Sequence, residues 1–177
     1  MTTRLVITGG FLGAGKTTLL LKAAQLLTAQ GYRVGLLTND QGEDLVDTAL
    51  GAQAAIPVTE VAGGCFCCRF PDLLTGLQRL EEVAAPDLVL LEPVGSCTDL
   101  VATVVRPLVQ FHGDRYQLAP LTILVDGTRD LTSFPPNVHY LYQQQLAEAE
   151  LLLLTKTDQL SAGQRDAQHL ALQNAYP

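Results

Sequence analysis

Three cysteines lie within four consecutive positions of this sequence. Cys65, Cys67 and Cys68 follow directly on Gly63 and Gly64. Thiolates are soft ligands for Zn²⁺, Co²⁺ and similar ions, and the two glycines allow the backbone bend that would turn three sulfurs toward one ion. Three protein ligands leave one coordination position open, which favours transfer of a metal over a permanent structural site. Packing as small apolar side chains and redox chemistry are the alternatives for this trio.

The fourth ligand of such a metal site is left open by the sequence. Water, Asp40, a side chain of a target protein and Cys97 are the candidates. Cysteines placed this unevenly are not the framework of a disulfide-stabilised domain, so metal or reactive-thiol chemistry is favoured. Simple burial is the alternative for Cys97, because free cysteine is among the most buried residue types.

A second group of residues that could do chemistry begins at Gly10. Residues 10–17 match the pattern GxxxxGK[ST], in which backbone NH groups and a helix N-terminus converge on phosphate oxygens. Lys16 would reach the outer phosphates, Thr17 would offer its hydroxyl to Mg²⁺, and Thr18 would contact the innermost phosphate. A glycine-rich turn before an ordinary helix is the alternative. The predicted nucleotide-binding residues in this segment are Gly10, Gly13, Ala14, Gly15, Lys16, Thr17 and Thr18.

A further motif addresses the base of the nucleotide. Residues 155–158 read Thr-Lys-Thr-Asp and match [NT]KxD. The Asp158 carboxylate can accept hydrogen bonds from the ring NH and exocyclic amine of guanine, whereas adenine presents no such donors there. Lys156 would lie over the base. A turn in which Asp158 or Ser161 caps the next helix is the alternative. Together with the phosphate loop, Thr155, Lys156 and Asp158 predict GTP as the bound nucleotide.

Two acidic residues join Lys16 in the predicted catalytic set. Glu92 ends an apolar run, where it would hold Mg²⁺ through water or orient the attacking water, and Gly95 would offer its NH to the terminal phosphate. Asp40 lies in a second acidic loop and is a candidate for a second Mg²⁺-side or a metal-side carboxylate, with a simple turn as the alternative. The loops after residues 39 and 92 would order around the triphosphate and relax after hydrolysis. Because no glutamine follows Gly95 and no arginine finger is evident in the sequence, we predict slow hydrolysis.

The elements that must position these residues are short apolar runs alternating with amphipathic segments. Apolar runs without alternation are typical of strands buried on both faces. Strand followed by helix, repeated, predicts an α/β fold of the P-loop NTPase type, with a mostly parallel sheet and helices on both faces. Ligands of such a sheet collect beyond the carboxyl ends of the strands, where each motif lies. The expected strands are 5–8, 34–38, 56–60, 88–92, 122–126 and 151–155, and the expected helices are 16–30, 71–84, 99–110, 138–149 and 161–175.

The composition fits a single domain over residues 1–177. Hydrophobic residues make up 47% of the chain and charged residues 16%, enough apolar side chains for one packed core. The formal charge of −7, from 11 basic and 18 acidic side chains without a basic block, argues against a nucleic-acid partner. No apolar run approaches the roughly 20 residues of a membrane span, and the N-terminus lacks the apolar region of a signal peptide. We therefore expect no membrane association and a cytoplasmic location.

In combination, these motifs resemble the GTPase domain of CobW-like proteins, relatives of the urease and hydrogenase maturation GTPases. The phosphate loop, Cys65-Phe-Cys-Cys68, Leu91-Glu-Pro-Val-Gly95 and Thr155-Lys-Thr-Asp158 follow the order and separation of that family, with lesser matches at 39–42 and 145–150. The likeness extends over residues 4–175, and CxCC is its most specific part. The resemblance implies a GTP-hydrolysing metallochaperone, in which CxCC binds Zn²⁺ or Co²⁺ and the nucleotide state governs release to a client metalloprotein.

The chain also departs from the family pattern. Members usually continue into a second domain, and by the resemblance the last base-contacting loop of the GTPase domain is missing here as well. We expect either a minimal domain that a homodimer or partner domain completes, or a truncated product. Residues 95–99 differ from the commoner small-residue version, which singles out Cys97. A non-hydrolysing GTP-gated scaffold with structural cysteines is one alternative function. A redox sensor or kinase that binds ATP or GTP is another.

Overall fold

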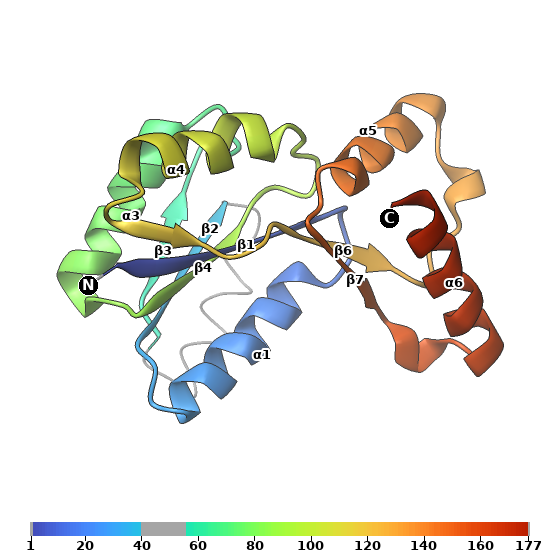
Figure 1. The fold of residues 1–177 in the computed structure, drawn as a ribbon, viewed down its shortest axis with the longest axis horizontal. Helices are drawn as coiled ribbons and strands as arrows, with labels where there is room; N and C mark the ends of the chain where they lie inside the picture. The colour runs from blue at the N-terminus through green and yellow to red at the C-terminus, as the bar shows by residue number, and fades with distance from the viewer. Residues whose placement is uncertain (1, 40–55, 177) are drawn as a thin grey trace.

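The computed structural model describes residues 2–39 and 56–176. Within these residues, seven strands form one sheet with helices on both faces (Figure 1). The order across the sheet is β3-β2-β4-β1-β6-β7, and β5 pairs with β1 as well. All pairings are parallel, which confirms the predicted α/β architecture. The strands are β1 (Thr3–Gly10), β2 (Val34–Asn39), β3 (Val58–Val61), β4 (Leu88–Glu92), β5 (Tyr116–Leu118), β6 (Thr122–Asp126) and β7 (Leu151–Thr155).

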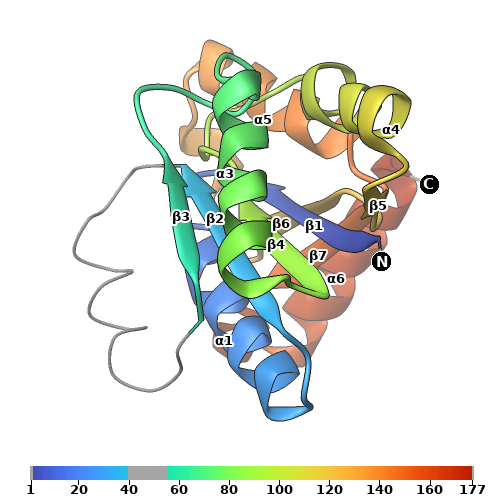
Figure 2. The ribbon, with the colours of Figure 1, turned by 90° about the vertical axis from the view of Figure 1, so that its left-hand side faces the viewer.

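The helices are divided between the two faces of the sheet. Figure 2 shows α1 (Lys16–Ala29) on the face opposite to α3 (Phe70–Ala84) and α4 (Arg106–His112). The helix α5 (Pro136–Ala147) contributes Tyr142 and Leu146 to the same core as α3 and α4. The last helix, α6 (Ala162–Ala175), lies beside β7, and all its residues are at least partly exposed.

Successive residues of the central strands enter two different cores. Leu37 of β2 and Leu91 of β4 are fully buried in the core shared with α3 and α5. Their neighbours Leu36 and Leu90 pack on the other face, against Leu20 of α1. Because side chains alternate across a strand, a strand covered on both sides must be apolar at every position. This burial explains the continuous apolar runs of the sequence.

Three elements differ from the sequence-based prediction. The expected helix 99–110 is a π-helical segment (Val101–Val105) followed by α4, and Pro107 stands at the first turn of α4, where a missing NH is tolerated. The expected strand 56–60 is shifted to Val58–Val61. The strand β5 was not predicted, because three residues are too short for a hydrophobic period. Its pairing with Thr3–Leu5 of β1 creates it.

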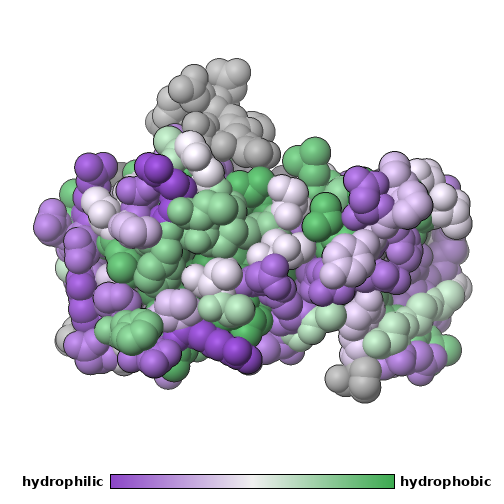
Figure 3. All heavy atoms as spheres, turned by 90° about the horizontal axis from the view of Figure 1, so that it is seen from above, coloured by the Kyte–Doolittle hydropathy of each residue, from purple (hydrophilic) through white to green (hydrophobic). Residues whose placement is uncertain are grey.

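One face of the domain carries exposed apolar side chains. Seen from the side of α3 and α4, apolar residues gather across part of the face and polar residues flank them (Figure 3). Exposed apolar side chains on these two helices include Val83, Val109 and Phe111. Within residues 2–39 and 56–176, no helix combines the length and the apolar character that crossing a membrane demands.

Candidate nucleotide and metal site

The loop between β1 and α1 has a backbone that suits phosphate binding. Gly10, Gly13 and Gly15 have φ angles of 136°, 77° and 92°, which side-chain-bearing residues rarely adopt. Gly10 also lies close to β6, since a methyl group on its Cα would come within 2.8 Å of the Leu124 carbonyl oxygen. The Ala14 NH donates to the Phe11 carbonyl at 3.1 Å and closes the turn. The glycines of the motif are therefore required by this conformation and by the close approach.

Lys16 begins α1 and reaches back over the loop. Its Nζ donates to the Gly10 carbonyl at 2.9 Å, and the side chain is buried. Burial lowers the pKa of Lys16, and the charge of Glu92 partly opposes this change. This position fits the predicted contact of Lys16 with the outer phosphates, which stays a prediction.

Thr17 and Glu92 meet at the junction of α1 and β4. The Thr17 hydroxyl donates to Glu92 Oε1 at 2.8 Å. Burial raises the pKa of Glu92, against the effects of the Thr17 hydrogen bond and the Lys16 charge. Hydroxyl and carboxylate oxygens are ligands that Mg²⁺ accepts, so the pair fits the predicted magnesium position. Thr18 is exposed in the same helical turn, and its phosphate contact stays a prediction.

Gly95 lies directly against the phosphate loop. A methyl group on its Cα would come within 2.9 Å of the Leu12 backbone nitrogen and 3.1 Å of Lys16 Nζ. The Gly95 carbonyl accepts a hydrogen bond from Gln145 Nε2 at 2.9 Å. The segment after β4 is thus in contact with the place where the terminal phosphate is expected. Glycine is needed there because any larger residue would collide with the loop.

The guanine motif is tied to the phosphate loop through its first residue. The Thr155 hydroxyl donates to the Ala14 carbonyl at 2.8 Å and approaches the Val125 carbonyl at 3.1 Å. Asp158 is exposed in a short 3-10 turn, while Ser161 caps α6 in a capping box with Gln164. The Asp158 carboxylate is therefore accessible to a ligand, and the expected contact with guanine stays a prediction.

Lys156 is held by an acidic residue at the end of β6, and its predicted place over a base stays a prediction. Its Nζ forms an ion pair with Asp126 Oδ2 at 2.7 Å, and its backbone has a φ of 56°. Burial would raise the pKa of Asp126, but the hydrogen bonds from Lys156 and Thr128 outweigh it and hold the pKa below its usual value. Asp126 thus anchors the guanine motif to the end of β6.

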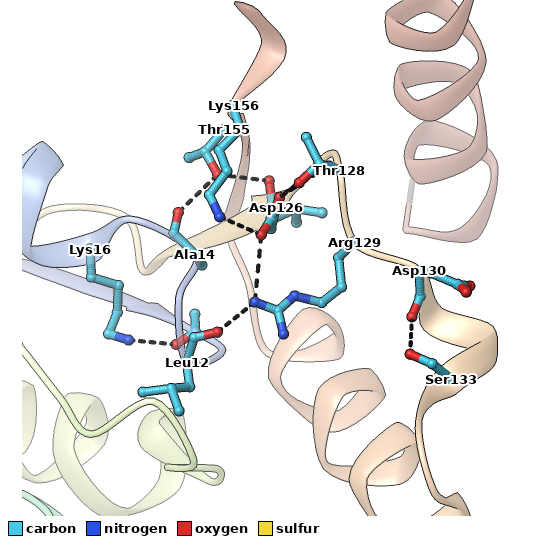
Figure 4. Close-up of polar contacts among 12 residues, drawn as sticks. Leu12, Ala14, Lys16, Asp126, Thr128, Arg129, Asp130, Ser133, Thr155 and Lys156 are labelled. Carbon is cyan, nitrogen blue, oxygen red and sulfur yellow. Dashed lines mark hydrogen bonds and ion pairs between the residues drawn. The ribbon is translucent and has the colours of Figure 1, made fainter. Parts of the chain in front are cut away.

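Sequence reasoning missed a cation beside the phosphate loop. Arg129 Nη2 donates to the Leu12 carbonyl at 2.6 Å and lies 3.5 Å from Asp126 Oδ2 (Figure 4). Its guanidinium lies over the rings of Phe11 and Phe134, at 5.4 and 5.7 Å from their centroids. The signal available in the sequence was position, because Asp126 to Arg129 follows a strand end as the other motifs do.

The cysteine cluster forms the turn between β3 and α3. The NH groups of Cys68 and Arg69 donate to the Cys65 carbonyl at 3.0 and 2.9 Å. This turn brings the sulfurs of Cys65, Cys67 and Cys68 within 4.8 Å of one another, close enough to share a metal ion. The structure joins Cys65 and Cys67 in a disulfide, which the sequence analysis did not expect. Metal binding by both sulfurs requires the reduced form, since metals take thiolates.

Cys97 adds a fourth sulfur to this turn from the segment after β4. Its Sγ lies 3.5 Å from Cys67 Sγ, and the side chain is buried. Burial raises the pKa of the Cys97 thiol to about 11. The burial agrees with the packing alternative, and the contact with Cys67 is an additional observation. Coordination by Cys97 stays a prediction.

Asn39, at the end of β2, positions the cysteine turn. Its Nδ2 donates to the carbonyls of Val61 and Gly64 at 3.1 and 2.5 Å. Its Oδ1 accepts from the Phe66 NH at 3.2 Å. The adjacent candidate Asp40 lies outside the described residues.

The phosphate loop, the Thr17–Glu92 pair and the sheet order define a P-loop nucleotide-binding domain, and a cysteine cluster follows its strand β3. The chain belongs to the CobW/HypB/UreG family, whose nucleotide-binding domain matches residues 4–175. This membership confirms the resemblance stated from the motifs.

Relatives with curated descriptions include two zinc chaperones. The chain is 31% identical to zinc chaperone YjiA of Escherichia coli, over 94% of this chain and 53% of the relative. It is also 31% identical to zinc chaperone CobW of a Sinorhizobium species, over 89% of this chain and 51% of that protein. The chain therefore spans about half the length of the curated relatives it matches.

Solved structures agree in fold. The zinc-bound YjiA GTPase of Escherichia coli superposes with a TM-score of 0.66 at 22% identity, covering 97% of this chain and 54% of that one. HypB of Helicobacter pylori, solved with nickel, gives 0.64 at 13% identity, covering 99% of this chain and 76% of that one. The two similarities support the P-loop GTPase fold of this domain.

Proposed function

We propose that this domain binds and slowly hydrolyses GTP and couples the nucleotide state to the transfer of Zn²⁺ or Co²⁺ from its cysteine cluster to a client metalloprotein in the cytoplasm. The zinc chaperones among the relatives support the assignment of a metal ion as the cargo, and so does the cluster of three sulfurs that could hold one ion. The Thr155–Asp158 motif and the family support the nucleotide.

One observation supports the proposed coupling between the nucleotide site and the metal site. The segment after β4 touches both sites: Gly95 packs on Leu12 and Lys16, and two residues later Cys97 lies 3.5 Å from Cys67. A ligand that repositions this segment at one end must alter its contacts at the other. By linkage, GTP would change the affinity for the metal, and the metal would change the affinity for GTP by the same factor.

The residues around the phosphate loop supply the hydrolytic chemistry. Water attacks the terminal phosphorus, the bond to the β-phosphate oxygen breaks, and GDP and phosphate leave. Lys16 stabilises the charge on the outer phosphate oxygens, and Glu92 orients the water or the magnesium shell. Bound Mg²⁺, held from Thr17 and Glu92, would neutralise charge on the phosphate oxygens. Arg129 is hydrogen-bonded to the Leu12 carbonyl, and no glutamine follows Gly95 to orient the attacking water. Both observations support the proposal that hydrolysis is slow.

The experiment measures Zn²⁺ affinity of the reduced protein with GDP and with a non-hydrolysable GTP analogue, together with phosphate release from GTP and ATP. We expect different Zn²⁺ affinities in the two states and slow phosphate release from GTP. Lys16→Ala should abolish nucleotide binding. Lys22→Ala, an exposed lysine on the same helix, is the matched control and should behave as the unmodified chain.

Three results would contradict parts of this proposal. Equal Zn²⁺ affinities would remove the coupling. Nucleotide binding without phosphate release would favour the GTP-gated scaffold. Equal competition by ATP and GTP would remove the guanine assignment of Asp158.

The Cys65–Cys67 disulfide favours a second candidate, a redox gate on metal binding. Two thiols of the trio would be oxidised to one disulfide while a small-molecule disulfide is reduced to two thiols, and the metal would leave as its ligands are lost. Titration with mixtures of reduced and oxidised glutathione, followed by thiol alkylation and mass spectrometry, tests this function. A cluster that stays reduced at every mixture tried would exclude it.

A further inference from the structure

Sulfurs from two separate segments meet at the turn between β3 and α3. Cys67 Sγ lies 3.5 Å from Cys97 Sγ and 3.9 Å from Cys68 Sγ, and Cys65 Sγ is within bonding distance of Cys67. Four Zn–S bonds of about 2.3 Å in a tetrahedron hold the sulfurs about 3.8 Å apart. The two separations from Cys67 Sγ bracket this value, so Cys68 and Cys97 each lie at a coordination-shell distance from Cys67, and reduction of the Cys65–Cys67 disulfide frees the remaining thiol.

We propose that Cys97 is the fourth ligand of the metal, and that the segment which senses the terminal phosphate supplies it. The inference rests on the proposed function and specifies how that function would work. In the state with GTP, four thiolates would close the site. After hydrolysis, withdrawal of Cys97 would leave three thiolates and one open position for a ligand of the client.

The direction of this switch follows from the place of Gly95. Gly95 packs on the Leu12 nitrogen and on Lys16 Nζ, the groups that we expect to face the outer phosphates. A terminal phosphate bound at Lys16 would meet an NH of this segment, and in the position of the segment described here Cys97 contacts Cys67. When that phosphate is lost, its hydrogen bond to the segment would be lost as well. The segment would then move away from the phosphate loop, and Cys97 would move away from Cys67.

A buried glutamine makes Gly95 and Cys97 move together. Gln145 Nε2 donates to the carbonyls of both residues, each at 2.9 Å, and the Cys97 NH donates to the Val94 carbonyl at 3.0 Å. Gln145 Oε1 is buried and has no hydrogen-bond partner among the described residues. This oxygen is available to an NH of the same segment in a second position, so Gln145 can serve both arrangements.

A closed shell of four thiolates retains its metal, whereas an open shell can exchange it. Each thiol that binds the metal gives its proton to solvent, and each released thiolate takes one back. Solvent therefore takes up and returns the thiol protons during transfer, and the ligand of the client replaces the released thiolate at the metal.

The test uses Co²⁺ as the probe, because the intensity of its sulfur-to-metal absorption follows the number of thiolate ligands. Reduced protein is loaded with Co²⁺ in the presence of GDP or of a non-hydrolysable GTP analogue. With the analogue, Cys97→Ser should lose about a quarter of the absorption, and its Zn²⁺ affinity should fall by at least about tenfold. With GDP, the variant and the unmodified chain should coincide.

Two variants and one measurement keep the outcomes separate. Cys68→Ser should lower the absorption in both nucleotide states, and Ser96→Ala, an exposed neighbour without sulfur, should change neither. X-ray absorption of the unmodified zinc protein counts sulfurs without any variant, and we expect four with the analogue and three with GDP. An unchanged Cys97→Ser spectrum, or three sulfurs in both states, would overturn the inference while the proposed function stands. Absence of thiolate-bound metal or of nucleotide binding in the unmodified chain would instead overturn the proposed function.

Discussion

At the scale of single residues, we expect Glu92 to be needed for catalysis while it lowers the stability of the folded protein at neutral pH. Its half-buried carboxylate accepts the Thr17 hydrogen bond and feels the charge of Lys16. Burial raises its pKa, so the folded protein binds a proton more readily than the unfolded chain does. Above the ordinary glutamate pKa of 4.5 the folded state therefore loses stability as pH rises toward the raised pKa.

Glu92→Gln should remove this loss while damaging catalysis. We expect a higher melting temperature of the nucleotide-free protein at pH 7, a smaller difference at pH 4, and a fall in GTP hydrolysis on the order of 10² or more. Calorimetry across pH and phosphate-release assays check both effects. Glu82→Gln, exposed on α3, is the control. A variant less stable at pH 7 than at pH 4, relative to the unmodified chain, would refute the account of burial.

Arg129 is the second residue whose role is decided by its contacts. Its guanidinium joins the Leu12 carbonyl to Asp126. Charge-assisted hydrogen bonds contribute about 1.5–3 kcal/mol, so Arg129→Ala should weaken GTP and GDP binding by roughly tenfold or more. Arg129→Lys should recover part of the affinity, because it keeps the charge and loses the planar fork.

The measurement for Arg129 is nucleotide titration by fluorescence. Arg165→Ala, an exposed arginine on α6, serves as the control. If Arg129→Ala bound both nucleotides normally, Arg129 would serve only to pack between Phe11 and Phe134.

At the scale of elements, the turn from β3 to α3 depends on the end of β2. Asn39 satisfies two carbonyls and one NH of this turn from a neighbouring strand. Asn39→Ala would leave those buried groups without partners, at a cost of about 1–3 kcal/mol. We expect lower stability, and weaker Co²⁺ binding because the sulfurs lose their common orientation.

Denaturant unfolding and Co²⁺ titration measure the two effects of Asn39→Ala. The control is Asn174→Ala on the exposed side of α6. Unchanged metal affinity in a destabilised Asn39→Ala protein would show that the cysteine turn holds its geometry alone.

At the scale of the whole molecule, packing is uneven across the sheet. The centre, β1, β2 and β4, is buried on both faces, whereas β7 is partly exposed along its length and α6 lies at the rim. A cavity of about 450 Å³ separates α5 from α6. The free energy of local opening should therefore be lowest at the end of the sheet that carries the predicted guanine motif.

Hydrogen exchange should reveal this gradient. We expect amides of α6 to exchange first and those of β1 and β4 last, and GTP to protect β7 and residues 156–160, because the base would bridge them to the phosphate loop. Peptide-resolved mass spectrometry with GTP, ATP or no nucleotide measures the pattern. Uniform exchange across the sheet, or equal protection by ATP, would contradict this expectation.

Much of the fold was predictable because its causes are local. The apolar runs predict the strands, and the glycines and Lys16 predict the phosphate loop, since each signal comes from neighbouring residues. The strand β5 and the π-helical segment were not predictable, because β5 depends on pairing with β1 and the π-helical segment breaks the helical period that the sequence suggested.

For this protein, sequence by itself determined which chemical groups exist and at which strand ends they emerge. Tertiary structure alone decided which of them touch. Cys97 meets Cys67 across 30 residues, and Arg129 meets Leu12 across 117. The hydrophobic periodicity of the sequence does not predict such contacts. They arise from the order of the strands across the sheet, which places strand ends that are distant in the sequence side by side.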